Sequence, residues 1–205
     1  MGTRLETCVV KNSKDTNARA FLRLPFDIYK GNNNWVPWFD NDIRIIMDKK
    51  HPYFEHSFAD FFVVKRGLET VGRITLLENT RYNREHGTKT AHFYFWDLYE
   101  DKDTADRLFE IAFDWAKKRN LSSVAGPLLF GGYTGSGILV DGFRHRCAMN
   151  MMNYNHPYYK DFLEGAGFTK MLDLHSSSLE PDKFQLPDRM RKVAEIVLKR
   201  GHFKV

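Results

Sequence analysis

The chain has 205 residues, of which 42% are hydrophobic and 28% charged, with a formal net charge of +5. This composition suits one sizeable folded domain and excludes a disordered chain, and no apolar run is long enough for a membrane-spanning helix. The two cysteines exclude a disulfide framework and a four-ligand zinc site. Because the first ten residues lack a basic and then apolar leader pattern, we expect a reduced, cytoplasmic protein with no membrane partner.

The positive charge is confined to the C-terminal end of the chain. Residues 183–205 carry seven basic and two acidic side chains, whereas residues 1–182 carry 24 of each sign. Such a distribution is typical of one basic helix face in water. We therefore do not expect nucleic acid as a partner, and a phosphate- or nucleic-acid-binding tail remains the alternative.

The first half of the chain alternates between helical and strand patterns. Residues 16–30 predict a helix that Pro25 kinks or splits, and residues 36–47 predict a short second helix. Two runs rich in β-branched and aromatic residues, 58–64 and 70–77, predict a hairpin around a turn at Gly67. The polar stretch that follows, residues 79–90, predicts turns.

Residues 90–99 predict a third, strongly aromatic strand. Strict alternation along this strand would place Phe93, Phe95, Asp97 and Tyr99 on one face and His92, Tyr94, Trp96 and Leu98 on the other. Asp97 is the one acidic residue within this apolar run.

The second half of the chain continues the mixed pattern, which indicates an α/β domain. Residues 104–119 predict the clearest helix, with Asp103 as its N-cap, because apolar residues recur at i, i+3, i+4 and i+7. Further predictions are a strand at 122–129, a helix at 157–166, a strand at 168–177 and a basic amphipathic helix at 187–200. The last four residues are similar to the beginning of a strand, so we expect further sequence after residue 205.

This order of elements resembles the GNAT superfamily of acyl-CoA N-acyltransferases. The segment NHPYYKDFLEGAGF (155–168) is similar to the last GNAT helix and its turn, and the hairpin DFFVVKRGLETVGRITLL (60–77) to the second and third strands. Further stretches, among them FLRLPFDIYKGNNNWVPWF and GILVDGF, are similar to a group of uncharacterised bacterial GNAT-like proteins that are usually longer. The resemblance implies a GNAT-like α/β fold with a mixed twisted sheet and helices on both faces. It implies a domain at 1–180, followed at 181–205 by the basic helix and the start of another element.

The resemblance implies N-acyltransferase activity, in which an unknown small-molecule amine directly attacks the thioester of acetyl-CoA or another acyl-CoA. The cofactor would lie between residues 90–99 and 122–129. The candidate cofactor-binding residues are Tyr99, Lys102, Thr104, Ala105, Gly126 and Asn155.

The phosphate-binding loop of the family departs from its usual pattern in this chain. The expected Q/R-x-x-G-x-G/A falls on residues 100–105, which read EDKDTA, so three carboxylates and one lysine would face a diphosphate. Each like-charge contact near a surface costs about 1 kcal/mol. This departure favours the alternative of a degenerate, non-catalytic GNAT-like domain that serves as scaffold or ligand-binding half, with a second domain or a homodimer as partner.

The usual GNAT general acid is a tyrosine four residues before the Gly-Phe pair, where this chain has Leu163. Tyr158 and Tyr159 are the substitute candidates, with packing of both rings as the alternative. The candidate general bases are Asp97, Glu78 and His92; burial in the apolar strand would raise the pKa of Asp97 towards a useful range.

Two further segments are alternative anion sites. The glycine-rich segment 131–137 is a second candidate phosphate cradle, although its spacing matches neither common phosphate-binding motif. The basic cluster Arg144-His145-Arg146 is a candidate for the 3′-phosphate of CoA, with solvated surface charge as its alternative.

Overall fold

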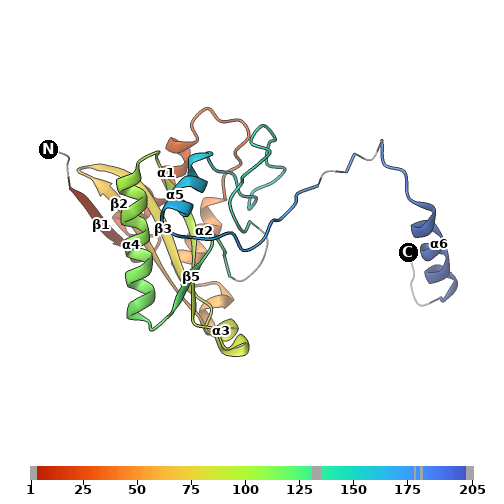
Figure 1. Cartoon of the computed structure of the whole chain (residues 1–205), viewed down its shortest axis with the longest axis horizontal. Helices are drawn as coiled ribbons and strands as arrows, with labels where there is room; N and C mark the ends of the chain where they lie inside the picture. Colours follow the sequence, from red (N-terminus) through yellow and green to blue (C-terminus); the bar gives the residue numbers. More distant parts are fainter. Residues whose placement is uncertain (1–3, 131–134, 178, 181, 202–205) are drawn as a thin grey trace. The chain divides into compact units, whose positions relative to one another are not determined.

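The structure is a computed structural model that describes residues 4–130, 135–177, 179–180 and 182–201. The chain divides into two units, residues 1–170 and residues 171–205 (Figure 1). The first unit contains the sheet. The predicted domain boundary after residue 180 stays a prediction.

A five-stranded sheet forms the centre of the first unit, in the order β1-β2-β3-β4-β5 (Figure 1). Its strands are β1 (Leu5–Val10), β2 (Phe58–Arg66), β3 (Glu69–Glu78), β4 (Thr90–Leu98) and β5 (Ser123–Ala125). The first four strands pair antiparallel and β5 pairs parallel to β4. The predicted hairpin of β2 and β3 is confirmed, and β1 is a strand that the sequence pattern did not predict.

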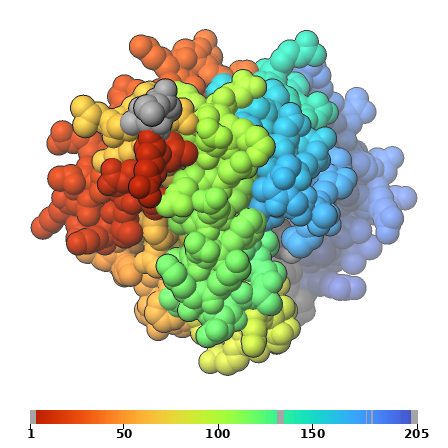
Figure 2. Space-filling model, turned by 60° about the vertical axis from the view of Figure 1, so that its left-hand side comes forward, coloured from red at the N-terminus to blue at the C-terminus, as the bar shows by residue number. Residues whose placement is uncertain are grey.

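Helices cover both faces of the sheet and close a hydrophobic core on each. The helices of this unit are α1 (Thr16–Ile28), α2 (Asp40–Met47), α3 (Thr80–His86), α4 (Lys102–Lys118) and α5 (Tyr158–Gly165), with a 3-10 turn at Pro52–Glu55. One core packs α4 and α5 against the sheet, and the other packs α1 and α2 against it. Figure 2 shows the first of these faces, with α4 in green beside the blue segment that contains α5. The predicted α/β architecture with helices on both faces is confirmed.

A β-bulge in β4 breaks the predicted alternation of its side chains. Phe95 and Trp96 together lie opposite the single residue Ile74 of β3, and Phe95 has a φ of +43°. A bulge re-aims the side chains that follow it. The core under α4 and α5 therefore receives Phe93, Trp96 and Leu98, and the core under α1 and α2 receives Tyr94 and Phe95.

Three other predicted elements differ from the structure. The predicted strand at 122–129 is only three residues long, since Pro127 has no N–H to continue the ladder. Among the described residues, no strand forms at 168–177, because a strand needs a neighbour for its backbone groups and the described sheet ends at β5. Residues 79–90 contain α3, which begins where the Asn79 side chain accepts the Tyr82 N–H.

In the second unit, α6 (Asp188–Lys199) is the predicted basic helix. Its large apolar side chains are exposed, namely Met190, Val193, Ile196 and Leu198. The predicted start of a further strand, at 202–205, lies outside the described residues. Within the part of the chain that is described, no helix has the length and apolar character needed to cross a membrane.

The close packing of α4 on β3 depends on Gly72. A Cβ atom at this position would lie 2.7 Å from Thr104 Cγ2 and 3.0 Å from Leu108 Cδ1, and both neighbours are fully buried. We expect Gly72→Ala to lower the free energy of unfolding by about 1–3 kcal/mol, because the core must shift to admit the methyl group. Urea denaturation of the whole chain measures this change.

The matched control is Gly165→Ala, at the last residue of α5, where an added Cβ meets no atom within 4 Å. This variant should be as stable as the native chain or slightly more stable. Equal stability of Gly72→Ala and the native chain would contradict the packing argument.

Candidate active site

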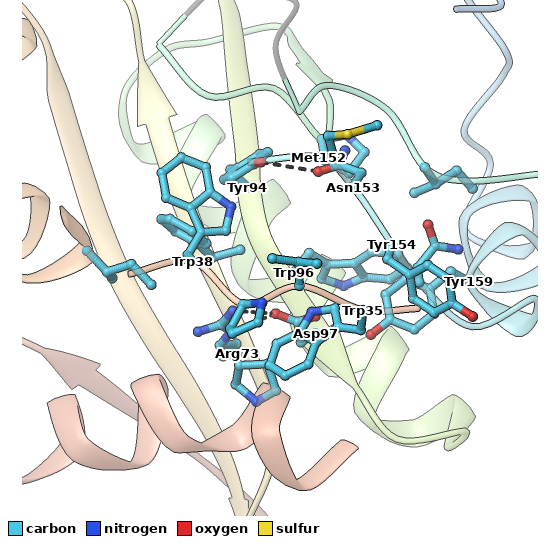
Figure 3. A pocket seen from close by; sticks show the side chains of 18 of the residues that line it. Trp35, Trp38, Arg73, Tyr94, Trp96, Asp97, Met152, Asn153, Tyr154 and Tyr159 are labelled. Carbon is cyan, nitrogen blue, oxygen red and sulfur yellow. Dashed lines mark hydrogen bonds and ion pairs between the residues drawn. The ribbon is translucent and has the colours of Figure 1, made fainter. Parts of the chain in front are cut away.

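A cavity of about 80 Å³ lies between α1, Arg73 of β3, residues 94–97 of β4 and two loop segments. Residues 94–97 of β4 form one wall, and the segments 35–40 and 152–155 form others. Figure 3 shows Trp38 and Tyr94 on one side of this space and Tyr154 and Tyr159 on the other. A cleft beside the aromatic strand is thus present in the fold.

A buried ion pair between Arg73 of β3 and Asp97 of β4 lies at the base of the cavity (Figure 3). Arg73 Nε and Nη2 lie 2.7 Å and 2.6 Å from Asp97 Oδ2. Arg73 is 4% exposed, and its third donor, Nη1, donates to the carbonyl oxygen of Phe21 in α1 at 2.8 Å. The guanidinium also lies 4.7 Å from the centre of the Phe21 ring.

The Phe21 carbonyl is free for Arg73 because of Pro25. In an α-helix this carbonyl would accept the N–H of the residue four positions later, and proline has none. The helix α1 nevertheless continues through Pro25 to Ile28 without being split. The proline therefore supplies a backbone acceptor to the buried cation.

A directed chain of hydrogen bonds leads from the backbone of β4 to Asp97. The Tyr29 hydroxyl donates to Asp97 Oδ1 at 3.2 Å and lies 3.1 Å from the Tyr159 hydroxyl. Because the single proton of Tyr29 goes to Asp97, Tyr159 is the donor in the second bond. The Leu98 N–H in turn donates to the Tyr159 oxygen at 3.3 Å. The tyrosine beside it, Tyr158, donates to the Leu98 carbonyl at 2.8 Å.

Tyr29, Tyr158 and Tyr159 are protonated at neutral pH. Burial raises the pKa of Tyr29 and of Tyr159 well above the ordinary value, and the negative charge of Asp97 acts in the same direction. Burial also raises the pKa of Tyr158. The three hydroxyls are therefore proton donors, and Asp97 is the anionic acceptor among them.

The other candidate bases lie elsewhere. Glu78 is paired with Arg119, with Oε2 and Nε 2.7 Å apart, and is not part of the cavity wall. His92 is 7% exposed in the core, and burial lowers its pKa. The structure thus brings together Asp97, Tyr158 and Tyr159 but neither Glu78 nor His92.

Asn155 lines the cavity, where its role is to hold a loop. Its Oδ1 accepts the Leu139 N–H at 2.6 Å, and its Nδ2 donates to the Leu139 carbonyl at 3.1 Å. Gly126 lies against β4, since a Cβ atom there would be 2.7 Å from the Phe93 carbonyl oxygen. Neither residue offers a free polar side-chain group to a cofactor.

The start of α4 differs from the prediction. The N-cap is Asp101 and not Asp103, because the helix begins two residues earlier, at Lys102. Asp101 Oδ2 accepts the Thr104 N–H at 3.1 Å, the Thr104 hydroxyl and Arg66 Nη2 at 2.8 Å. Although burial raises the pKa of Asp101, these hydrogen bonds and the charge of Arg66 lower it below the ordinary value overall.

The remaining candidate residues at this helix start also have partners within the chain. Lys102 pairs with Asp106 at 2.5 Å, Thr104 and Ala105 are buried, and Tyr99 packs against the core under α4. A diphosphate would have to displace a cap that already fills the positive end of the helix. The residues here therefore do not fit the diphosphate of CoA.

The two alternative anion sites, residues 131–137 and residues 144–146, lie in different surroundings. Residues 131–134 of the glycine-rich segment lie outside the described residues, and Gly137 at its end lines the cavity. Residues 144–146 are exposed.

The sequence analysis did not predict Arg73, Tyr29 or the tryptophans of the segment 35–38 as residues of the site. A signal for Arg73 exists in the sequence, since it is the one charged residue within the apolar run TVGRITLL. A buried arginine requires an anionic partner, and Asp97 is the single acid in the next strand. Tyr29 has no comparable signal, because the two partners of its hydroxyl, Asp97 and Tyr159, lie 68 and 130 positions away in the sequence.

The Arg73–Asp97 pair should be strongly coupled in stability. We expect Arg73→Met to lower the free energy of unfolding by about 3–5 kcal/mol, because it leaves a buried carboxylate without its cation. The double variant Arg73→Met, Asp97→Asn should recover part of that loss. A double-mutant cycle by urea denaturation measures the coupling, and additive effects of the two changes would argue against the ion pair.

Comparison with known proteins gives two curated relatives, and no protein-family model matches the chain. Protein YghO of Escherichia coli (strain K12) is 28% identical over 183 residues, which cover 89% of this chain and 46% of that protein. The bacterial ceramide synthase of Caulobacter vibrioides (strain NA1000 / CB15N) is 25% identical over 201 residues, which cover 97% and 51%. The chain spans about half the length of both relatives. The expected further sequence after residue 205 is not confirmed.

Among solved structures, the chain is similar to a tandem GNAT protein from the clavulanic acid biosynthesis pathway. The match has a TM-score of 0.51 and 14% identity, and it covers 80% of this chain and 43% of that protein. Identity at this level is evidence of fold and not of activity. The resemblance first drawn from the helix and strand order is confirmed for the architecture: the chain has the fold of the GNAT superfamily.

Proposed function

We propose that this chain is an acyltransferase domain that acylates an amine, with Asp97 accepting the proton of the amine. The observation that carries the proposal is the hydrogen-bonded chain of Tyr159, Tyr29 and Asp97, whose two ends, Tyr159 and Asp97, line the cavity. The relative whose name is bacterial ceramide synthase supports an amine acceptor, since ceramides are N-acylated amino alcohols.

Asp97 has the geometry of a held base. Both bonds from Arg73 go to its Oδ2, which fixes the plane of the carboxylate, and Oδ1 accepts the Tyr29 hydroxyl. A carboxylate oxygen accepts more than one hydrogen bond, so Oδ1 retains capacity for a proton from an amine in the cavity. Removing that proton exposes the nitrogen lone pair that must attack an acyl carbon.

Tyr159 is the better placed of the two candidate acids. Its side chain lines the cavity, and its hydroxyl, kept protonated by burial, donates to Tyr29, whereas Tyr158 does not line the cavity and donates to the Leu98 carbonyl. In this proposal Tyr159 holds a proton beside the reaction space. Tyr158 positions the end of β4.

Acetyl-CoA is the acyl donor that the GNAT resemblance implies, and a thioester would supply the activated carbonyl carbon. The capped start of α4 does not fit its diphosphate. We therefore assign no phosphate-binding role to this helix start. The same observation, together with Leu163 at the usual position of the acid, favours a second candidate function, a non-catalytic ligand-binding domain.

The catalytic proposal is tested with Asp97→Asn. We expect acyl transfer to a panel of primary amines to fall by about 10²-fold or more, because the amide cannot accept the proton. Thiol release from acetyl-CoA and from longer acyl thioesters measures the rate, and far-UV circular dichroism checks that the variant is folded.

The matched control for this assay is Asp106→Asn, which removes an exposed carboxylate on α4 and should leave the rate unchanged. An equal rate for Asp97→Asn and the native chain would remove Asp97 from the mechanism. Absence of transfer with every amine and thioester would favour the non-catalytic candidate.

The helix start is tested by CoA binding. We expect Asp101→Gly to bind CoA more tightly than the native chain in isothermal titration calorimetry, since it frees the Thr104 N–H and Arg66 for a phosphate. Asp103→Asn, which removes a charge from the first turn but no cap, should give a smaller gain. Equal affinities for native chain and Asp101→Gly would contradict the role given to the cap.

A further inference from the structure

The walls of the cavity are dominated by aromatic rings. Six tryptophan and tyrosine side chains line it: Trp35, Trp38, Tyr94, Trp96, Tyr154 and Tyr159. Figure 3 shows these rings on opposite sides of the space, with the Arg73–Asp97 pair beside them. Aromatic ring faces carry partial negative charge and attract cations that are brought against them.

Trp38 and Trp35 belong to one short segment, WVPW, and both are partly exposed at the cavity. Trp38 packs edge-to-face with Tyr94 and with Phe95, at centroid distances of 6.1 Å and 5.3 Å. Trp35 stacks on Tyr29 at 5.0 Å, and the Tyr29 hydroxyl contacts Asp97. Trp35 is therefore held by a residue that also holds the carboxylate, and Trp38 is held by the aromatic residues of β4.

The charge of the cavity wall is negative. Its ionisable residues apart from the tyrosines are Asp40, Asp97 and Arg73 among the described residues. The Arg73 donors are committed to Asp97 and to the Phe21 carbonyl, and its side chain is 5% exposed. The Asp97 side chain is 13% exposed, so the carboxylate is the more accessible partner of the pair.

The two asparagine side chains of the wall are committed to the fold, whereas the Trp96 indole N–H, a donor, is buried without a hydrogen-bond partner among the described residues. Asn153 accepts the Tyr94 hydroxyl at 3.1 Å and donates to the Gly137 carbonyl, and Asn155 holds Leu139. Asp97 Oδ1 thus stands out as the anionic acceptor with capacity for a ligand, and apart from Arg73 on its other oxygen the side chains near it on the wall are mainly aromatic. A carboxylate beside aromatic faces is complementary to an alkylammonium group.

We infer that the cavity recognises its ligand by a positively charged alkylammonium group, held against the tryptophan and tyrosine rings and Asp97. This inference rests on the proposed function, in that the ammonium belongs to the amine acceptor. It goes further, because it names charge as the basis of selection. An acceptor would enter as the ammonium ion and give up its proton only beside Asp97.

The test uses a cation that cannot be acylated on nitrogen. Choline and its neutral carbon isostere, 3,3-dimethylbutan-1-ol, have nearly the same shape and differ in charge. Titration of the whole chain at constant ionic strength, followed by tryptophan fluorescence and calorimetry, should show saturable binding of choline at least tenfold tighter than binding of the alcohol. Equal or tighter binding of the alcohol, or no binding of choline, would overturn the inference.

Substitutions in the cavity wall test whether choline binds there. Asp97→Asn and Trp38→Leu should each weaken choline binding at least fivefold, and Asp106→Asn should leave it unchanged. Trp38→Leu leaves the ion pair in place, so it serves if Asp97→Asn fails to fold. Unchanged choline affinity in folded Trp38→Leu would place the cation outside this cavity and contradict the inference.

The result of the choline titration can be distinguished from the result of the acyl-transfer assay. Selective choline binding without any transfer would uphold the cation site and reject the catalytic proposal. Transfer to amines by a protein that prefers the neutral isostere would do the reverse.

Discussion

The buried pair of Arg73 and Asp97 is the interaction on which the arrangement of this domain depends. A buried guanidinium is tolerated only when its donors are satisfied, and here they are satisfied by two different elements: the carboxylate of β4 and the Phe21 carbonyl of α1. The pair therefore ties α1 to the centre of the sheet. The cavity lies beside the point where α1 meets the sheet, so its geometry depends on how the donors of Arg73 are satisfied.

The bulge in β4 makes the pair possible. Without it, strict alternation would put Asp97 on the same face as Phe93, which lies in the core under α4 and α5. The extra residue turns the end of the strand, so that Asp97 pairs with Arg73 beside α1 while Trp96 and Leu98 move to the core under α4. The bulge in β4 thus places one residue of a buried strand, Asp97, on the wall of the cavity.

The sequence pattern predicted the parts of this fold that are set by local composition, and the reason is physical. The hairpin, the aromatic strand and the long helix follow from periodicity within short windows. The bulge, the helix start at Lys102 and the partner of Tyr29 depend on contacts across the fold, which no window contains. Residues 168–177 show the converse, since an apolar run carries strand propensity but cannot supply its own neighbour.

The cavity and the start of α4 are in opposite states in this chain. At the cavity, Asp97 and the rings around it are fixed by a hydrogen-bonded network before any ligand arrives, which lowers the entropic cost of binding. At the start of α4, Asp101 neutralises both the helix end and Arg66, the basic side chain in contact with it. For the acyltransferase function that we propose, discrimination between ligands should therefore come from the cavity, and the start of α4 should add no affinity through the phosphates of an acyl donor.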